Sequence, residues 1–175
     1  MVNLYRISAD GQPIAFVRQK RMAIKEDIRF FANEDETEEL FRLKARAVME
    51  FSGRYDVTTP EGERIGVLGK VFGRSLFRST WRVLDAAEQE LAIATERSFT
   101  IAILRRAAEA IPYADFIPIP FHFTIDRGDR HIGDMNRRLG FRDTYELDVA
   151  GDVERTIDRR LAVALGIALD ALQSR

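Results

Sequence analysis

Three basic side chains, Arg42, Lys44 and Arg46, alternate with apolar residues along the segment 41–47. Because successive side chains of a β-strand point to opposite faces, this spacing places the three cations on one strand face. Such a face can bind phosphate groups or an acidic partner through charge-assisted hydrogen bonds. The alternative is a solvated strand face whose cations pair with neighbouring carboxylates, as surface charges readily do.

A second basic cluster, Lys70, Arg74 and Arg78, surrounds Gly73. A glycine corner can present backbone N–H groups to an anion, and nearby cations add positive charge. The alternative is structural: the glycine bends the strand and the cations keep the corner in contact with water. A similar arrangement occurs later in the chain, with Arg137, Arg138 and Arg142 around Gly140. This recurrence favours the structural interpretation, and both stay open.

Two histidines, His122 and His131, flank a predicted hairpin, with Asp126 and Asp129 nearby. A histidine beside a carboxylate can act as a general base. Both histidines lie on the predicted polar face, and the spacing places no third metal ligand beside them. The two histidines are therefore interpreted either as ordinary surface residues or as part of a catalytic or metal-binding site.

Other signatures of catalysis are missing from the sequence. It has no cysteine, which excludes disulfides, zinc–thiolate clusters and thiol catalysis. It also has no Walker A pattern, no dinucleotide fingerprint and no nucleophile-elbow serine. We therefore expect a protein that is not an enzyme and that has no cofactor, metal site or catalytic residue.

Composition predicts one soluble domain over residues 1–175, with 46% hydrophobic and 31% charged residues. The net charge of −1 argues against nucleic-acid binding by the whole surface. The start of the chain lacks signal-peptide features, and the apolar stretch 161–169 is shorter than the ~20 residues of a membrane span. We expect a cytoplasmic protein. The acidic run 34–39 is interpreted as a solvated turn, or as a dock for a basic partner.

An internal repeat organises the strands that must position these side chains. Residues 55–83 and 123–147 share one order: strand, turn, strand, glycine corner, then a strand with an aromatic residue after threonine. A weaker third copy covers residues 5–30. Turn residues separate the strands at Asp10-Gly11, Pro60-Glu61-Gly62 and Arg127-Gly128-Asp129. Each copy predicts a three-stranded meander, and such units tend to close on one another because closure removes exposed edges.

Two helices interrupt the strands. A surface helix is predicted at about 99–110, since its apolar residues share one face. A second helix is predicted at about 152–173, with Asp152 as its N-cap. From Leu161 to Leu169 every residue is apolar or glycine, so protein must surround this helix. It is expected to fill a barrel too wide for strand side chains to fill alone.

The chain resembles the LURP-one-related (LURF-one-related) family of the tubby C-terminal-like superfamily, which also includes phospholipid scramblases. The resemblance rests on Tyr55-Asp56-Val57-Thr58 with its turn, Ile65-Gly66, the run from Lys70 to Trp81, and the hydrophobic stretch 152–172. It implies a closed barrel of about twelve strands around a central helix. Tubby proteins bind phosphoinositides, whereas scramblases carry a membrane-inserting C-terminal segment, and we do not expect scramblase-like insertion for this chain.

These observations predict a mainly β protein with two helices: a tubby-like closed barrel of antiparallel strands around a buried C-terminal helix. The expected function is binding of anionic or phosphorylated lipid ligands, peripherally at the membrane. Two alternatives are a protein-interaction or structural scaffold that uses sheet edges and the acidic run, and a hydrolase-like enzyme that uses a hairpin histidine. The candidate anion-binding residues are Arg42, Lys44, Arg46, Lys70, Arg74 and Arg78.

Overall fold

A computed structural model describes residues 2–20, 27–46, 53–71, 79–97, 122–138 and 144–172. These residues form eleven strands and one helix. The elements are β1 (Val2–Ala9), β2 (Gln12–Lys20), β3 (Asp27–Phe31), β4 (Glu39–Ala45), β5 (Arg54–Thr58), β6 (Arg64–Lys70), β7 (Thr80–Asp85), β8 (Glu90–Glu96), β9 (His122–Arg127), β10 (Arg130–Arg138), β11 (Thr144–Asp148) and α2 (Arg159–Ala171). The predicted helix at about 99–110 lies outside the described residues.

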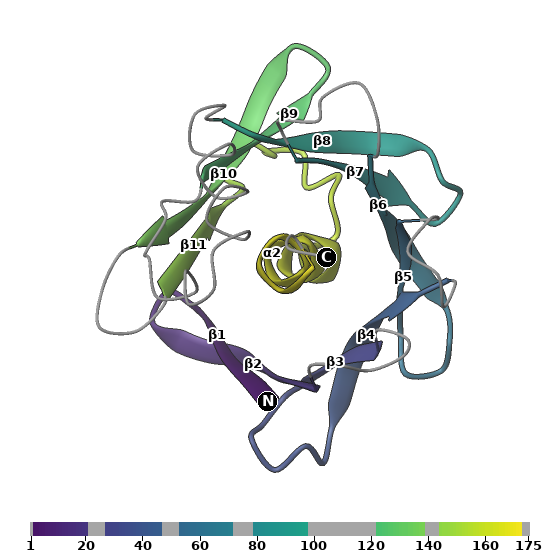
Figure 1. Cartoon of the computed structure of the whole chain (residues 1–175), viewed down its shortest axis with the longest axis vertical. Helices are drawn as coiled ribbons and strands as arrows, with labels where there is room; N and C mark the ends of the chain where they lie inside the picture. The colour runs from purple at the N-terminus through teal and green to yellow at the C-terminus, as the bar shows by residue number, and fades with distance from the viewer. Residues whose placement is uncertain are drawn as a thin grey trace, which may run out of the picture.

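The strands form one antiparallel sheet in which each strand pairs with its neighbour in sequence, from β1 to β11. The sheet curls around α2, which lies at its centre (Figure 1). Within the described residues no ladder joins β1 to β11, so the sheet is not closed. The prediction of a closed barrel of about twelve strands was therefore wrong in this respect, because sequence periodicity does not encode which edges pair.

The predicted repeat appears as three meanders: β1–β2–β3, β5–β6–β7 and β9–β10–β11. Its hairpin turns lie where the sequence placed them. In the first turn Asp10 and Gly11 both have positive φ, at 51° and 76°. Two successive left-handed residues suit the right-handed twist of a hairpin, which explains why an Asp-Gly pair occupies this position. The glycine corners at Gly73 and Gly140 lie outside the described residues.

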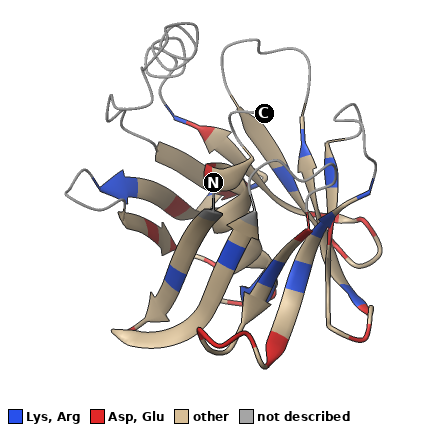
Figure 2. Ribbon diagram, turned by 60° about the horizontal axis from the view of Figure 1, so that its bottom comes forward, with Lys and Arg blue, Asp and Glu red and all other residues tan. Residues whose placement is uncertain are grey.

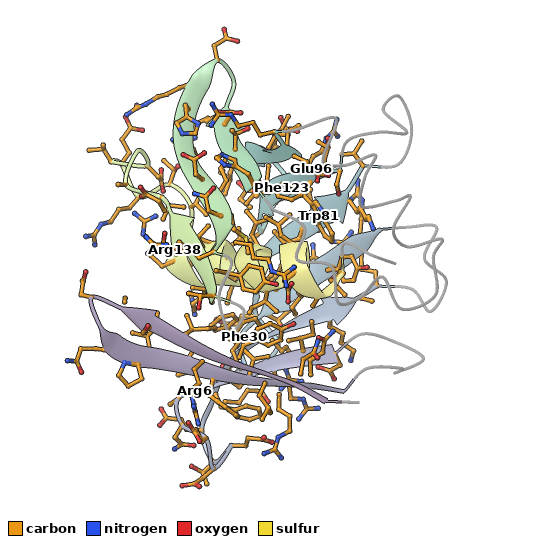
Figure 3. The ribbon with its side chains drawn as sticks, turned by 60° about the vertical axis from the view of Figure 1, so that its left-hand side comes forward. Arg6, Phe30, Trp81, Glu96, Phe123 and Arg138 are labelled. Carbon is orange, nitrogen blue, oxygen red and sulfur yellow. The ribbon has the colours of Figure 1, made fainter. Side chains whose placement is uncertain are left out.

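Period-two alternation directs one face of each strand toward α2. Phe41 and Leu43 of β4 are buried, while Lys44, which follows them, is exposed. Trp81 and Phe123 are fully buried, which confirms the prediction that Trp81 belongs to the core. Figure 3 shows these inward aromatic side chains gathered around the helix, with Arg6 and Arg138 pointing outward.

The central helix begins later than the sequence indicated. Its N-cap is Asp158, whose side chain accepts a hydrogen bond from the Arg160 N–H. Asp152, predicted as the cap, instead lies in the turns that precede the helix, where Arg155 has a positive φ of 50°. A left-handed residue cannot continue a right-handed helix, so the helical segment is Arg159–Ala171 rather than 152–173.

The enclosure of α2 was predicted correctly. Its residues Leu161, Leu165 and Leu169 are all at most 1% exposed. The helix also touches the sheet closely at Gly66 of β6, where a Cβ atom, if one were present, would lie 2.7 Å from the Leu161 Cδ2 atom. Glycine is therefore required at that position for the helix and strand to approach.

Candidate functional site

The basic stripe, Arg42, Lys44 and Arg46, follows β4 on the outer surface, as predicted from its spacing. Figure 2 shows basic residues along several strands and acidic residues in the turns at the bottom and right of the view. The Arg42 Nε atom donates to Glu39 at 2.6 Å. Lys44 is exposed, and its cross-strand neighbours are Asp27 and Asp56. Among the described residues, no carboxylate lies within ion-pair distance of the Lys44 Nζ atom.

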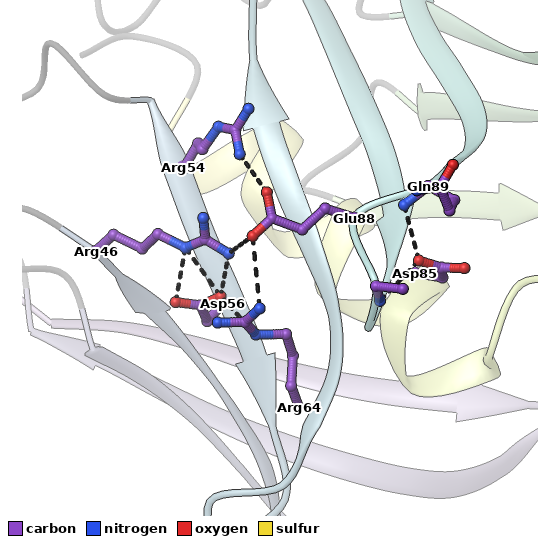
Figure 4. A network of polar contacts seen from close by, with 8 residues as sticks. Arg46, Arg54, Asp56, Arg64, Asp85, Glu88 and Gln89 are labelled. Carbon is purple, nitrogen blue, oxygen red and sulfur yellow. Dashed lines mark hydrogen bonds and ion pairs between the residues drawn. The ribbon is translucent and has the colours of Figure 1, made fainter.

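Arg46 belongs to a network of polar contacts on the outer face of β5 and β6, shown in Figure 4. We call Arg46, Arg54, Asp56, Arg64 and Glu88 the Arg46 network. The Arg46 guanidinium donates to Asp56 at 2.8 Å and to Glu88 at 2.7 Å. The hydrogen bonds that Arg46 donates to Asp56, and then those to Glu88, raise the pKa of Arg46, which keeps it charged at any relevant pH.

Two further arginines complete the Arg46 network. Arg54 binds the second carboxylate oxygen of Glu88. Arg64 lies 3.3 Å from Asp56 and 3.5 Å from Glu88. The hydrogen bond from Arg46 is the main cause that lowers the pKa of Glu88. The network therefore brings three guanidinium groups onto two carboxylates.

The other candidate cluster is only partly described. Lys70, at the end of β6, donates from Nζ to the Leu172 carbonyl oxygen at 3.1 Å, and its ammonium lies 5.9 Å from the centre of the Trp81 ring. These contacts direct Lys70 toward the C-terminal end of α2. Arg74 and Arg78 lie outside the described residues.

The equivalent residues of the later repeat copy have partners of their own. Arg138 forms an exposed ion pair with Glu146 at 2.7 Å. The Arg137 guanidinium carbon lies 5.8 Å from the centre of the Tyr145 ring. Arg142 lies outside the described residues.

The two histidines share a carboxylate on the outer face of β9 and β10. Asp134 contacts the Nε2 atom of His122 at 3.0 Å and that of His131 at 2.9 Å. The Nδ1 atom of His131 also lies 3.0 Å from Asp126. Since both ring nitrogens of His131 face acceptors, its imidazolium form is favoured, and its hydrogen bonds to Asp126 and then to Asp134 raise its pKa. A ring held in this way has no free nitrogen to accept a proton from a substrate.

No group of three or more potential metal ligands converges among the residues that the structure covers. In the described part of the chain, no helix is long and apolar enough to cross a membrane.

The acidic run 34–39 lies in the turn between β3 and β4 and at the start of β4, and three of its five carboxylates form ion pairs. Glu34 pairs with Arg6 at 2.6 Å, and Glu36 pairs with Arg18 at 2.9 Å. Together with the pair that Glu39 makes with Arg42, these contacts neutralise much of the charge that a basic partner would recognise.

A known protein family matches most of the chain. The LURP-one-related family profile covers residues 14–170. The chain belongs to the LURP-one-related family. No curated protein and no solved structure shows significant similarity to it.

In this LURP-one-related chain, sequence reasoning missed most of the Arg46 network. Arg54 and Asp56 alternate along β5, which is a signal that both point outward. Glu88 gave no comparable signal, because it lies in a turn between β7 and β8 that contains neither glycine nor proline. Only the folding of this turn over the sheet brings Glu88 to an arginine 42 residues earlier in the chain.

Proposed function

We propose that this LURP-one-related domain is a non-enzymatic module that binds anionic or phosphorylated lipid headgroups at the cytoplasmic surface of a membrane. The observation that supports the proposal is a surplus of positive charge on the outer face of β4, β5 and β6. Among the described residues there, five cations lie beside three carboxylates: Arg42, Lys44, Arg46, Arg54 and Arg64 beside Glu39, Asp56 and Glu88. Guanidinium and ammonium groups bind phosphate oxygens through charge-assisted hydrogen bonds.

The resemblance to the tubby C-terminal-like superfamily also supports a lipid ligand, because tubby proteins bind phosphoinositides. A shared fold is weak support for a shared ligand, so the charge surplus carries the proposal. The proposed contact residues are those of the basic stripe and the first glycine corner: Arg42, Lys44, Arg46, Lys70, Arg74 and Arg78.

Co-sedimentation with liposomes of graded anionic and phosphoinositide content tests this function. We expect binding that rises with phosphoinositide content and weakens with salt, because salt screens charges over about 10 Å at moderate ionic strength. The double variant Arg42→Ser with Lys44→Ser should weaken liposome binding. A separate triple variant, Lys70→Ser with Arg74→Ser and Arg78→Ser, tests the contribution of the first glycine corner. Arg82→Ser serves as a control, since Arg82 is an exposed arginine that pairs with Glu90 on the neighbouring strand.

A protein-interaction or structural scaffold is the second candidate function. It is favoured by the two ends of the sheet, because β1 and β11 each have only one strand partner within the described residues. An unpaired edge offers backbone N–H and C=O groups to a strand of another chain. Absence of liposome binding even at low salt would contradict the lipid proposal and leave this one in its place.

A further inference from the structure

The carboxylate of Glu88 occupies the centre of a three-arginine cluster. We call Arg46, Arg54 and Arg64 the arginine triad. Arg46 and Arg64 contact one oxygen of Glu88 at 2.7 and 3.5 Å, and Arg54 binds the other oxygen (Figure 4). A single carboxylate that receives three guanidinium groups from three different segments of the chain is bound as an anionic ligand would be.

The backbone at Glu88 is in an uncommon conformation. Its φ of 63° is in the left-handed region, which a non-glycine residue adopts at a cost of about 1 kcal/mol. The turn does not depend on the triad, because the Asp85 carboxylate accepts hydrogen bonds from Ala87 N–H at 2.9 Å and Gln89 N–H at 2.8 Å. Rotation of the Glu88 side chain alone would therefore vacate the triad and leave the turn intact.

A phosphate monoester can take the place of the Glu88 carboxylate. With Glu88 rotated outward, the three guanidinium groups lose a carboxylate that all of them contact, while Arg46 and Arg64 keep their contacts with Asp56. A phosphate monoester carries about −1.5 to −2 charges near neutral pH and three acceptor oxygens. Arg54 and Arg64 are 45% and 43% exposed in their side chains, so such a ligand can reach them from solvent.

We propose that the arginine triad is a phosphate-monoester site and that Glu88 is its built-in competitor, which the ligand displaces. The inference rests on the proposed anion-binding function and adds two residues, Arg54 and Arg64, that the sequence did not suggest. It also names the group that regulates the site. Because the ligand binds only molecules in which Glu88 has rotated out, its apparent affinity is reduced by the fraction that is open.

A structural role is the competing explanation. Val67 and Leu84 pair across β6 and β7, and both are buried although they do not belong to the main core cluster. Val67 also lies opposite Asp56, so the Arg46 network and the turn that carries Glu88 cover this outer apolar pair. If Glu88 serves only to cover these two residues, its charge contributes to stability and does not compete with a ligand.

Titration with inorganic phosphate, followed by NMR chemical shifts of arginine side chains, separates the two explanations. Glu88→Gln removes the competing charge and keeps the side-chain shape. It should bind phosphate about tenfold more tightly than the unmodified protein, as expected if the open form is about a tenth of the population. Glu90→Gln is the matched control, because Glu90 pairs with Arg82 on the same hairpin and does not contact the triad. It should leave the affinity unchanged.

Substitution of the two exposed arginines tests whether the phosphate binds at the arginine triad. Arg54→Gln with Arg64→Gln, made in the Glu88→Gln protein, should abolish the gain, and thermal unfolding checks that each variant is folded. Equal phosphate affinity of Glu88→Gln and the unmodified protein would overturn the inference. A gain that survives loss of Arg54 and Arg64 would also overturn it, since the phosphate would then bind elsewhere.

Vesicles distinguish a lipid headgroup from a free phosphate. Phosphatidylcholine vesicles containing phosphatidic acid present a phosphate monoester, whereas vesicles of matched charge containing phosphatidylserine do not. Preference of Glu88→Gln for phosphatidic acid supports a lipid source, and binding of inorganic phosphate without any vesicle binding supports a soluble one and contradicts only the lipid function. If the unmodified protein binds anionic vesicles and neither Glu88→Gln nor Arg54→Gln with Arg64→Gln changes this, the lipid function stands and the Glu88 inference fails.

Discussion

Asp152 is a buried carboxylate that secures the approach to the central helix. Its side chain is 0% exposed and accepts hydrogen bonds from Arg127 at 2.8 Å, and from the N–H groups of Thr156 and Ile157 at 3.1 Å each. Burial alone would raise its pKa, but the hydrogen bonds from Ile157 and Thr156 and the charge of Arg127 outweigh burial and lower it. The residue thus fixes the chain before α2 rather than capping the helix itself.

Asp152→Asn should lower the free energy of unfolding by about 3 kcal/mol at neutral pH, because it breaks a buried charge pair and weakens several hydrogen bonds. Since the pKa in the folded state is lowered, the stabilisation is fully present above the unfolded pKa of about 3.9 and is lost as pH falls through the folded value. Urea unfolding at neutral pH and at about pH 3 should therefore show a difference that shrinks in acid.

The control for this prediction is Asp129→Asn, which changes an exposed carboxylate in the β9–β10 turn. It should shift the free energy of unfolding by less than about 0.5 kcal/mol. If Asp152→Asn were equally mild at neutral pH, the carboxylate would not be what holds this segment.

At the scale of elements, the contact between β6 and α2 depends on one missing side chain. A Cβ on Gly66 would lie 2.5 Å from the Leu84 carbonyl oxygen and 2.7 Å from the Leu161 Cδ2 atom. Gly66→Ala should therefore lower the free energy of unfolding by about 1–3 kcal/mol, through a forced shift of helix or strand. Gly69→Ala is the matched control on the same strand, since its nearest contact would be the Arg82 Cβ at 3.9 Å. Equal stability of the two variants in urea unfolding would contradict this packing.

The burial of α2 gives a second prediction for an element. Leu165 is 1% exposed, so Leu165→Asp should prevent soluble folding, because an unpaired buried carboxylate costs several kcal/mol against a total stability of about 5–15 kcal/mol. Leu165→Ala should fold with a loss of about 2–5 kcal/mol. Arg160→Asp introduces the same residue at an exposed position of the helix and should fold normally. Soluble, cooperatively unfolding Leu165→Asp protein would place the helix outside the sheet.

At the scale of the whole molecule, Asp170 of α2 links the two ends of the sheet. Its carboxylate accepts hydrogen bonds from the Tyr5 hydroxyl of β1 at 2.8 Å and the Tyr145 hydroxyl of β11 at 2.5 Å. Since no ladder joins β1 to β11 in the described residues, the central helix provides a connection that the strands themselves do not.

Asp170→Ala should lower the free energy of unfolding by about 1–3 kcal/mol and speed amide hydrogen exchange mainly in β1 and β11. Tyr5→Phe removes only one of the two hydrogen bonds and should affect β1 more than β11. Exchange that rises equally in β6 and in the two edge strands would show that Asp170 supports the fold generally rather than this junction.

The sequence by itself determined the faces of several strands and the enclosure of the C-terminal helix. Alternation along β4 predicted that Phe41 and Leu43 are buried, and an all-apolar stretch predicted an enclosed helix. These features follow from local periodicity, since side-chain direction repeats every two residues in a strand. The turn residues likewise predicted the hairpins β1–β2, β5–β6 and β9–β10.

Only the tertiary structure decided which charges meet and where the sheet ends. Glu88 reaches Arg46 across 42 positions of sequence, and Tyr5 reaches Asp170 across 165. Such contacts depend on strand register, sheet curvature and the direction in which a turn folds, none of which leaves a fixed spacing in the chain. The helix begins after Asp158 rather than Asp152, because Arg155 has a positive φ and Arg127 of β9 engages Asp152.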